Sequence, residues 1–150
     1  MISPKLVRLI EEHGEQIISR VISQIRREPQ MTHIHALMDT ELREWGRDLL
    51  EHLGHWLSAG IEEDLARRYE RIGRVLCEQE APLSQCLRGL FLIREKVMDY
   101  LEEQVLSKTH VDLYAEEETE RRLNRFFDLL VIHLAHGYER ALRKAAVANV

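Results

Sequence analysis

Histidine is the residue type in this sequence whose number and spacing could support metal or haem chemistry. The chain has eight histidines among 150 residues. The pairs His52 with His55 and His133 with His136 have the i, i+3 spacing that places two side chains on one face of a helix. Because imidazole nitrogens bind zinc and form the proximal ligand of globin haem, His133 or His136 is a candidate axial ligand.

The carboxylates that a di-iron helical bundle needs do not accompany these histidines. Such bundles use Glu-x-x-His motifs, and no histidine in the chain has a glutamate three residues before it. On a helix, His52 falls on the same apolar face as Leu49, while His55 and His136 fall at the flanks of their apolar faces. Packing and surface roles are therefore favoured, and we predict no metal and no cofactor.

Arg94 is the charged side chain with the most apolar neighbours, among them Leu90 and Val97 on the same helical face. A guanidinium in such surroundings must be paired or must reach water. Asp128 and Glu139 on the last helix are its candidate partners. The sequence favours an internal ion pair, and the alternative is that Arg94 lines a pocket and holds an anionic group.

The two cysteines, Cys77 and Cys86, lack the close spacing of zinc and redox motifs. Cys86 falls on an apolar helical face and is predicted to be a small buried hydrophobe. The chain shows no nucleophile with a base, no metal set and no phosphate loop. These absences predict that the protein is not an enzyme, and the sparse cysteines favour a reducing cytoplasm.

Charge and hydropathy exclude two further classes of protein. The net charge is −5, and acidic and basic residues are interleaved, so no basic face suggests nucleic acid. No stretch without Asp, Glu, Lys or Arg is longer than Leu129–Tyr138, which is far shorter than the ~20 residues that a membrane helix needs. We therefore expect a soluble cytoplasmic protein, with residues 1–150 forming one helical domain.

Apolar residues recur every three or four positions and predict an all-α bundle of about five main helices. The third helix has a thin apolar stripe and is expected on the outside, whereas the fourth is apolar nearly all round and should be the most buried. Gly89 and Gly137 are expected at helix crossings, because glycine lets backbones approach closely. The helices are expected over about residues 4–28, 39–58, 62–80, 83–106 and 116–144.

The last of these helices is the element around which the chain is organised. Its apolar stripe is broken only by Gly137 and is long enough to contact several helices and a second copy of the chain. We therefore predict that this helix supplies core contacts and also forms the exit of the chain from the bundle. The stripe consists of Phe126, Phe127, Leu130, Leu134, Tyr138, Ala141 and Leu142.

Three segments of the chain resemble a known family. Leu83–Glu95, followed by Arg125–Asp128 and Gly137–Ala141, is similar to the amino-terminal sensor domain of RsbR-type stressosome proteins. The same type of domain precedes the catalytic core of some bacterial histidine kinases. The earlier helices have a similar layout, so the resemblance covers nearly the whole chain.

The resemblance implies a globin-like helical fold without haem, which homodimerises through its terminal helices. It also implies that the last helix passes a change of state to an output domain or a stressosome-type partner protein. This chain stops at Val150, and both a stand-alone protein and the sensor half of a longer one stay open. We predict a non-enzymatic sensor domain of bacterial stress-response signalling; the alternative is a haem- or small-molecule-binding globin with a histidine axial ligand.

Overall fold

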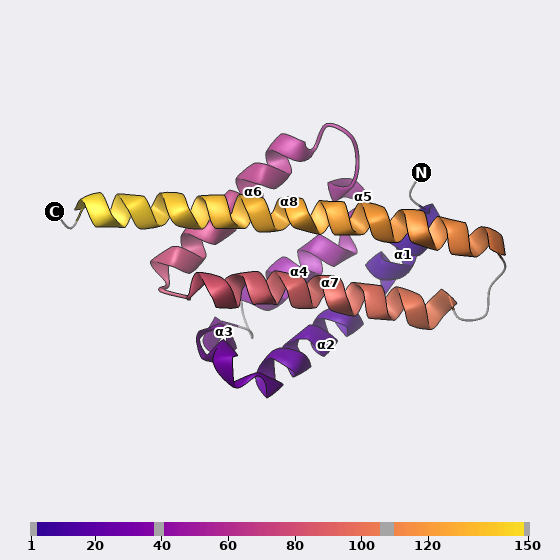
Figure 1. The fold of residues 1–150 in the computed structure, drawn as a ribbon, viewed down its shortest axis with the longest axis horizontal. Helices are drawn as coiled ribbons and strands as arrows, with labels where there is room; N and C mark the ends of the chain where they lie inside the picture. Colours follow the sequence, from indigo (N-terminus) through magenta and orange to yellow (C-terminus); the bar gives the residue numbers. More distant parts are fainter. Residues whose placement is uncertain (1–2, 38–40, 106–109, 149–150) are drawn as a thin grey trace.

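The computed structural model of the chain describes residues 3–37, 41–105 and 110–148. Within these ranges the chain forms helices and no strand, which confirms the predicted all-α, globin-like bundle with a long C-terminal helix. The last two helices run antiparallel and form the longest layer (Figure 1). The helices are α1 (Pro4–Glu12), α2 (Gly14–Arg27), the 3₁₀ helix η1 (Pro29–Met31), α3 (Thr32–Leu37), α4 (Arg43–Glu51), α5 (Leu53–Trp56), α6 (Glu62–Glu78), α7 (Leu83–Val105) and α8 (His110–Ala148).

The beginning of α1 is fixed by its cap and by a bond to α8. Ser3 Oγ accepts a hydrogen bond from the Leu6 amide at 3.4 Å, and Pro4 occupies the first helical turn, where its missing N–H leaves nothing unpaired. The Ser3 amide also donates to Thr119 Oγ1 at 3.1 Å, and Thr119 is fully buried on α8. The first helix is thereby tied to the last.

Two helices that the sequence predicts as continuous are interrupted at a histidine. The breaks lie at His13 (φ −116°, ψ 20°) and at His52 (φ −119°, ψ 27°). At each break the ring Nδ1 lies near the carbonyl oxygen four residues earlier, that of Leu9 at 2.9 Å and that of Asp48 at 3.1 Å. A side chain that competes for a carbonyl of the helical ladder bends or ends the helix, which periodicity alone does not reveal.

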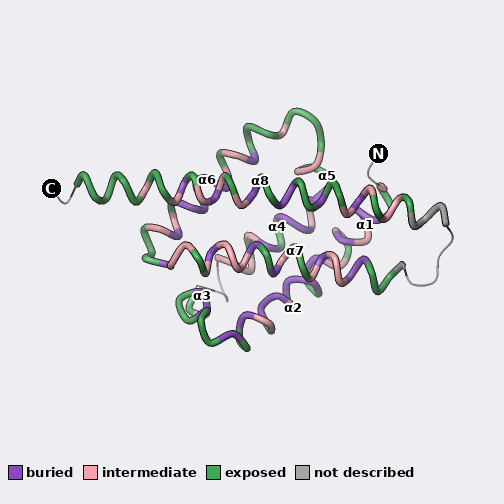
Figure 2. The backbone as a smooth tube through the Cα atoms, in the orientation of Figure 1, coloured by how far each residue is buried: buried purple, intermediate pink, exposed green. Residues whose placement is uncertain are grey.

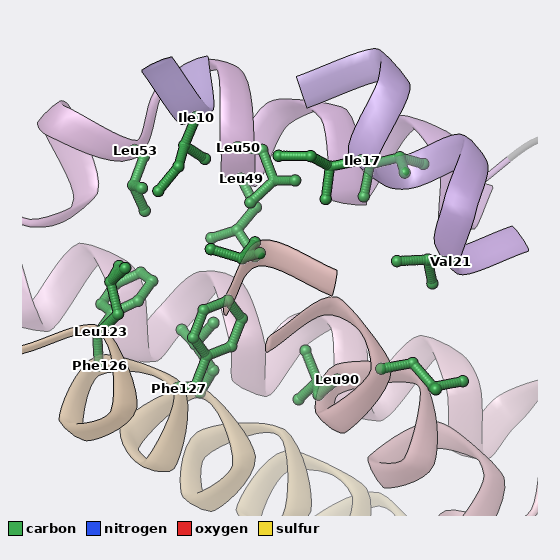
Figure 3. Packing of buried hydrophobic residues seen from close by; sticks show 14 of the residues in the cluster. Ile10, Ile17, Val21, Leu49, Leu50, Leu53, Leu90, Leu123, Phe126 and Phe127 are labelled. Atoms are coloured by element: carbon green, nitrogen blue, oxygen red, sulfur yellow. The ribbon is translucent and has the colours of Figure 1, made fainter. Parts of the chain in front are cut away.

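Side chains from α1, α2, α4, α7 and α8 converge on one apolar core (Figure 3). Phe127 of α8 is 1% exposed and is the largest fully buried side chain in the described part of the chain. Leu49 and Leu50 reach the same core from α4, and Leu90 reaches it from α7. The stripe of α8 is thus covered mainly by the chain itself.

The relative burial of α6 and α7 differs from the prediction. The polar side of α6 faces solvent as expected, yet α6 packs against α8 more extensively than any other pair of helices does. Conversely, α7 is not buried all round, because Phe91 is 37% exposed. Counting apolar residues overestimated the burial of α7, since part of its apolar surface has no neighbour within the chain.

A buried carboxylate fastens the end of α2 to α7. Glu28 is 8% exposed, and its two carboxylate oxygens accept hydrogen bonds from Arg88 Nε at 2.9 Å and Arg88 Nη2 at 3.0 Å. Gln24 Nε2 donates to the same carboxylate at 3.1 Å. Hydrogen bonds from Arg88 and Gln24 hold the pKa of Glu28 below its usual value.

The C-terminal end of α8 projects beyond the other helices (Figure 1). Residues 142–148 are all exposed, whereas buried positions recur along the preceding part of α8 (Figure 2). Among the described residues, no helix combines the length and the apolar character needed to cross a membrane.

Candidate signalling site on the last helix

The backbones of α6 and α8 approach each other closely where the two helices cross at Gly73 and Gly137. A Cβ atom added at Gly137 would lie 2.0 Å from the Glu70 carbonyl oxygen, and one added at Gly73 would lie 2.1 Å from the Leu134 carbonyl oxygen. Backbone therefore packs directly on backbone at this point, as glycine alone permits. The crossing predicted at Gly137 is confirmed. Its partner Gly73 was not singled out, because a lone glycine in an amphipathic helix carries no other sequence signal.

The crossing predicted at Gly89 is wrong. Among the described residues, a Cβ atom added at Gly89 would meet nothing within 4 Å, so no helix in these ranges packs against this residue. Gly89 is half-buried in the middle of α7, and open space takes the place of the expected neighbour.

Tyr138 connects α8 to the turn between α6 and α7. Its hydroxyl donates a hydrogen bond of 2.6 Å to the Ala81 carbonyl oxygen. The preceding residue, Glu80, has φ 62°, a left-handed conformation that is uncommon for a residue with a side chain. Burial raises the pKa of the Tyr138 phenol, which keeps it protonated as a donor. The turn and α8 are thus joined one residue after the Gly137 crossing.

The apolar stripe of α8 divides into a buried and an exposed part. Phe126, Phe127, Leu130 and Leu134 are at most 5% exposed within this one chain, and Ala141 is half-buried. Elsewhere on the same helix, Leu129 is 39%, Ile132 60% and Leu142 55% exposed. The residues that a second copy can reach are therefore the exposed ones.

Arg94 lies at the edge of this exposed surface. Its Nη1 is 3.3 Å from Asp128 Oδ1, and its guanidinium carbon is 5.1 Å from the centre of the Phe91 ring. The side chains of Arg94 and Asp128 are 29% and 66% exposed, so this is a surface tie between α7 and α8 and not an internal one. Glu139, the other candidate partner, is exposed farther along α8, and no ion pair joins it to Arg94 among the described contacts.

The histidine pairs do not converge on a common site. His136 is 48% exposed and its Nδ1 lies 3.4 Å from Glu70 Oε1 on α6, while His133 is half-buried. The predicted apolar position of His52 is wrong, since the break in the helix leaves it 60% exposed. In the described ranges, no group of three or more His, Cys, Asp or Glu side chains is placed to hold a metal ion.

Both cysteines have raised pKa values, chiefly because of burial. The pKa of Cys86 rises to about 11, and the side chain is 5% exposed, as expected for a small buried hydrophobe. The pKa of Cys77 is raised in the same direction. Both thiols therefore stay protonated near neutral pH, where the reactive thiolate is scarce.

The chain matches the model of a known protein family. The family described as "RsbT co-antagonist protein rsbRD N-terminal domain" matches residues 15–149 of the chain. No curated protein and no solved structure matches the chain. The matched range begins in α2 and includes the glycine crossing, the Tyr138 contact and the exposed face of α8. The chain therefore belongs to the family of RsbR-type stressosome N-terminal domains.

Proposed function

We propose that this chain is a non-enzymatic sensor domain that forms a homodimer and transmits a signal through α8 to an output domain or a stressosome-type protein. Its cytoplasmic location and its action as one domain over residues 1–150 are part of the proposal. The family supports a signalling role. The observation that carries the dimer is the exposed apolar surface of α7 and α8.

This surface, which we call the outer face, is defined by Phe91, Ile132 and Leu142. The Arg94–Asp128 pair links α7 to α8. Because the two helices are antiparallel, a residue before Arg94 on α7 lies beside a residue after Asp128 on α8. Phe91 and Ile132 are therefore at about the same level. A contiguous patch of large exposed apolar side chains is typical of an interaction surface, and we propose that these three residues belong to one. A second copy of the chain would bury the same residues in a symmetric contact.

The signal is proposed to travel through the attachment of α8. The helix is held by Thr119 near its beginning, by the Gly73–Gly137 crossing and by the Tyr138–Ala81 hydrogen bond. Beyond Ala141 it is exposed on all sides. Since a helix advances about 1.5 Å per residue, the last seven described residues project about 10 Å. A change in the crossing would therefore displace the emerging end.

Such a change requires two packings of α8 and a ligand or partner that favours one of them. The outer face supplies a place where the second copy contributes to this choice. The core residues Phe127 and Leu130 fix the position of α8 within one chain. The residues of the outer face contact the second copy of the chain.

Sedimentation velocity of the purified chain tests the proposal. Wild type is expected to sediment as a dimer at micromolar concentrations. Substituting both Ile132 and Leu142 with Glu should raise the dissociation constant more than about 100-fold, because each buried large apolar side chain contributes about 1.5–3 kcal/mol and occurs twice in the dimer. Ala59→Glu, at an exposed position in the turn after α5, is the matched control and should remain dimeric.

Circular dichroism should show the same helical content in all three proteins, because the substituted side chains are exposed in one chain. A monomeric wild type, or an Ile132→Glu/Leu142→Glu variant that dimerises as well as wild type, would contradict the proposed interface. The haem-binding alternative is tested separately by an absorption spectrum after adding haemin, with His133→Ala and His136→Ala as the comparison variants.

A further inference from the structure

An apolar pocket of about 70 Å³ lies between α2, α4, α6 and α7. Its floor is made of buried side chains, among them Ile22 of α2, Ile72 of α6 and Leu90 of α7. Its mouth is made of half-buried residues, among them Trp45 and Ile93. The lining includes neither His133 nor His136, so this pocket is separate from the residues considered for haem.

Gly89 is placed at this pocket and helps to keep it open. Glycine is less stable than alanine in the middle of a helix, and a helix crossing usually accounts for such a residue. Here an added Cβ atom would meet nothing within 4 Å, although Gly89 lines the pocket. The missing side chain therefore leaves room in the pocket and serves no close backbone contact.

Gln85 is one of the lining residues, and its side-chain amide carries a hydrogen-bond donor. Its Oε1 accepts from the backbone amides of His33 at 3.1 Å and Ile34 at 3.3 Å. Because backbone amides can only donate, this oxygen is fixed and the other terminal atom is the NH₂ group. Within the described part of the chain that NH₂ group has no acceptor, and Gln85 lines the pocket, so a ligand can provide one.

We propose that this pocket binds a small aliphatic molecule that carries one hydrogen-bond acceptor. Its carbon chain would lie on the apolar floor and its oxygen would accept from Gln85 Nε2. The volume is about half that of the ~150 Å³ apolar cavity that binds benzene or xenon. A ligand with a few carbon atoms inside and its polar end at the half-open mouth fits this space.

The pocket also adjoins the crossing of α6 and α8. Leu134 lines the pocket, and its carbonyl oxygen is the atom closest to a Cβ added at Gly73. Ile72, also in the lining, precedes Gly73 on α6. An occupied pocket would bias the packing at this crossing. This coupling rests on the proposed function, whereas binding in the pocket does not.

Methyl-resolved NMR of the full chain, titrated with 1-butanol, tests binding. The Ile22, Ile34 and Ile72 methyl groups should show saturable shifts, and the Ile10 methyl group, which is buried in the core but does not line the pocket, should not shift. Gly89→Leu places a side chain in the open space and should weaken binding at least tenfold. This variant should stay folded, because leucine is a better helix former than glycine.

Two further measurements sharpen the test. Gln85→Glu keeps an acceptor for the His33 and Ile34 amides but removes the donor. It should therefore weaken the binding of 2-butanone, which has an acceptor and no donor, and leave xenon binding unchanged. Non-saturable shifts in wild type, or equal butanol binding in wild type and Gly89→Leu, would overturn the proposed site. Unchanged 2-butanone binding in Gln85→Glu would overturn the role of the amide.

Sedimentation of the same samples separates this inference from the proposed function. A monomeric wild type that binds butanol would contradict the homodimer and support the pocket. A dimer whose pocket methyl groups do not respond would contradict the pocket alone.

Discussion

Replacing Gly137 with alanine tests how α8 is attached to the rest of the fold. The added Cβ would lie 2.0 Å from the Glu70 carbonyl oxygen and 2.6 Å from the Glu70 Cα. Real Cβ atoms do not approach other atoms closer than 3.0 Å, so α6 and α8 must separate by about 1 Å. The obstructing atoms belong to the backbone of a helix and cannot rotate away.

The expected loss of stability follows from two opposing effects. Alanine stabilises a helix interior by about 1 kcal/mol relative to glycine. Overpacking a close contact costs about 1–3 kcal/mol or more, and the rigid backbone at this site places the cost at the upper end. Gly137→Ala should therefore destabilise the protein by about 2 kcal/mol in net terms.

Gly89→Ala is the matched control, because it makes the same chemical change in the neighbouring helix. Its Cβ would meet nothing within 4 Å, so only the gain of about 1 kcal/mol in helix stability remains. For a chain of this length 1 kcal/mol shifts Tm by about 2–4 °C. The two variants should therefore differ by about 3 kcal/mol, or roughly 6–12 °C.

Urea and thermal unfolding followed by circular dichroism would measure this difference at one fixed protein concentration, because dimerisation makes stability depend on concentration. Gly73→Ala should behave like Gly137→Ala. If Gly137→Ala were as stable as Gly89→Ala, the backbone contact between α6 and α8 would not exist as described, and the proposed route of the signal would lose its basis.

Three further predictions concern single contacts. Tyr138→Phe removes the 2.6 Å hydrogen bond to the Ala81 carbonyl and should lower the free energy of unfolding by about 1–2 kcal/mol in urea titrations; a change below the error of the titration would contradict it. Arg88→Leu leaves the Glu28 carboxylate without its guanidinium partner. Because the pKa of Glu28 is lowered in the fold, the free energy of unfolding of wild type should fall as the pH drops below about 4.5. The free energy of unfolding of the variant should fall less over the same range. Burial and neighbouring carboxylates raise the pKa of Glu120, so its ionisation opposes folding as the pH rises above about 4.5. Glu120→Gln should therefore be more stable than wild type at pH 7 and similar to it at pH 4. Equal stability of the two proteins at pH 7 would count against this prediction.

Helical periodicity predicted most of the fold because the apolar stripes are long. The helix expected over 116–144 lies within α8, and the one expected over 62–80 matches α6 closely. Proline and serine at the beginning of α1 carry a direct capping signal, and the structure confirms it. In these segments local preference and tertiary packing agree, so the sequence pattern is sufficient.

The breaks at His13 and His52 could not be predicted from periodicity. Each depends on an imidazole that lies against a carbonyl oxygen one turn earlier, and histidine is otherwise compatible with a helix. Each break precedes a glycine by one or two residues, Gly14 and Gly54, which is the one local signal in the sequence. Several apolar side chains continue on the same face across both breaks, which hides the interruption.

The candidate site was predicted only in part, because it depends on contacts between distant segments. Gly137 drew attention by interrupting an apolar stripe, whereas its partner Gly73 lies in a helix with ordinary amphipathic character. The Glu28–Arg88 pair joins residues separated by 60 positions, and no local pattern links them. The division of the α8 stripe into core and outer face likewise depends on which neighbours cover it.

A distance between the two copies of residue 132 tests the proposed homodimer most directly. Ile132→Cys, in a background with Cys77→Ser and Cys86→Ala, would carry a spin label on the outer face, and double electron–electron resonance would measure the separation. Packed helices have axes about 8–10 Å apart, so a symmetric contact through this face predicts one narrow distance distribution below about 30 Å. A wild-type-like fold with no dipolar signal, or with a distance well beyond that range, would contradict dimerisation through α7 and α8.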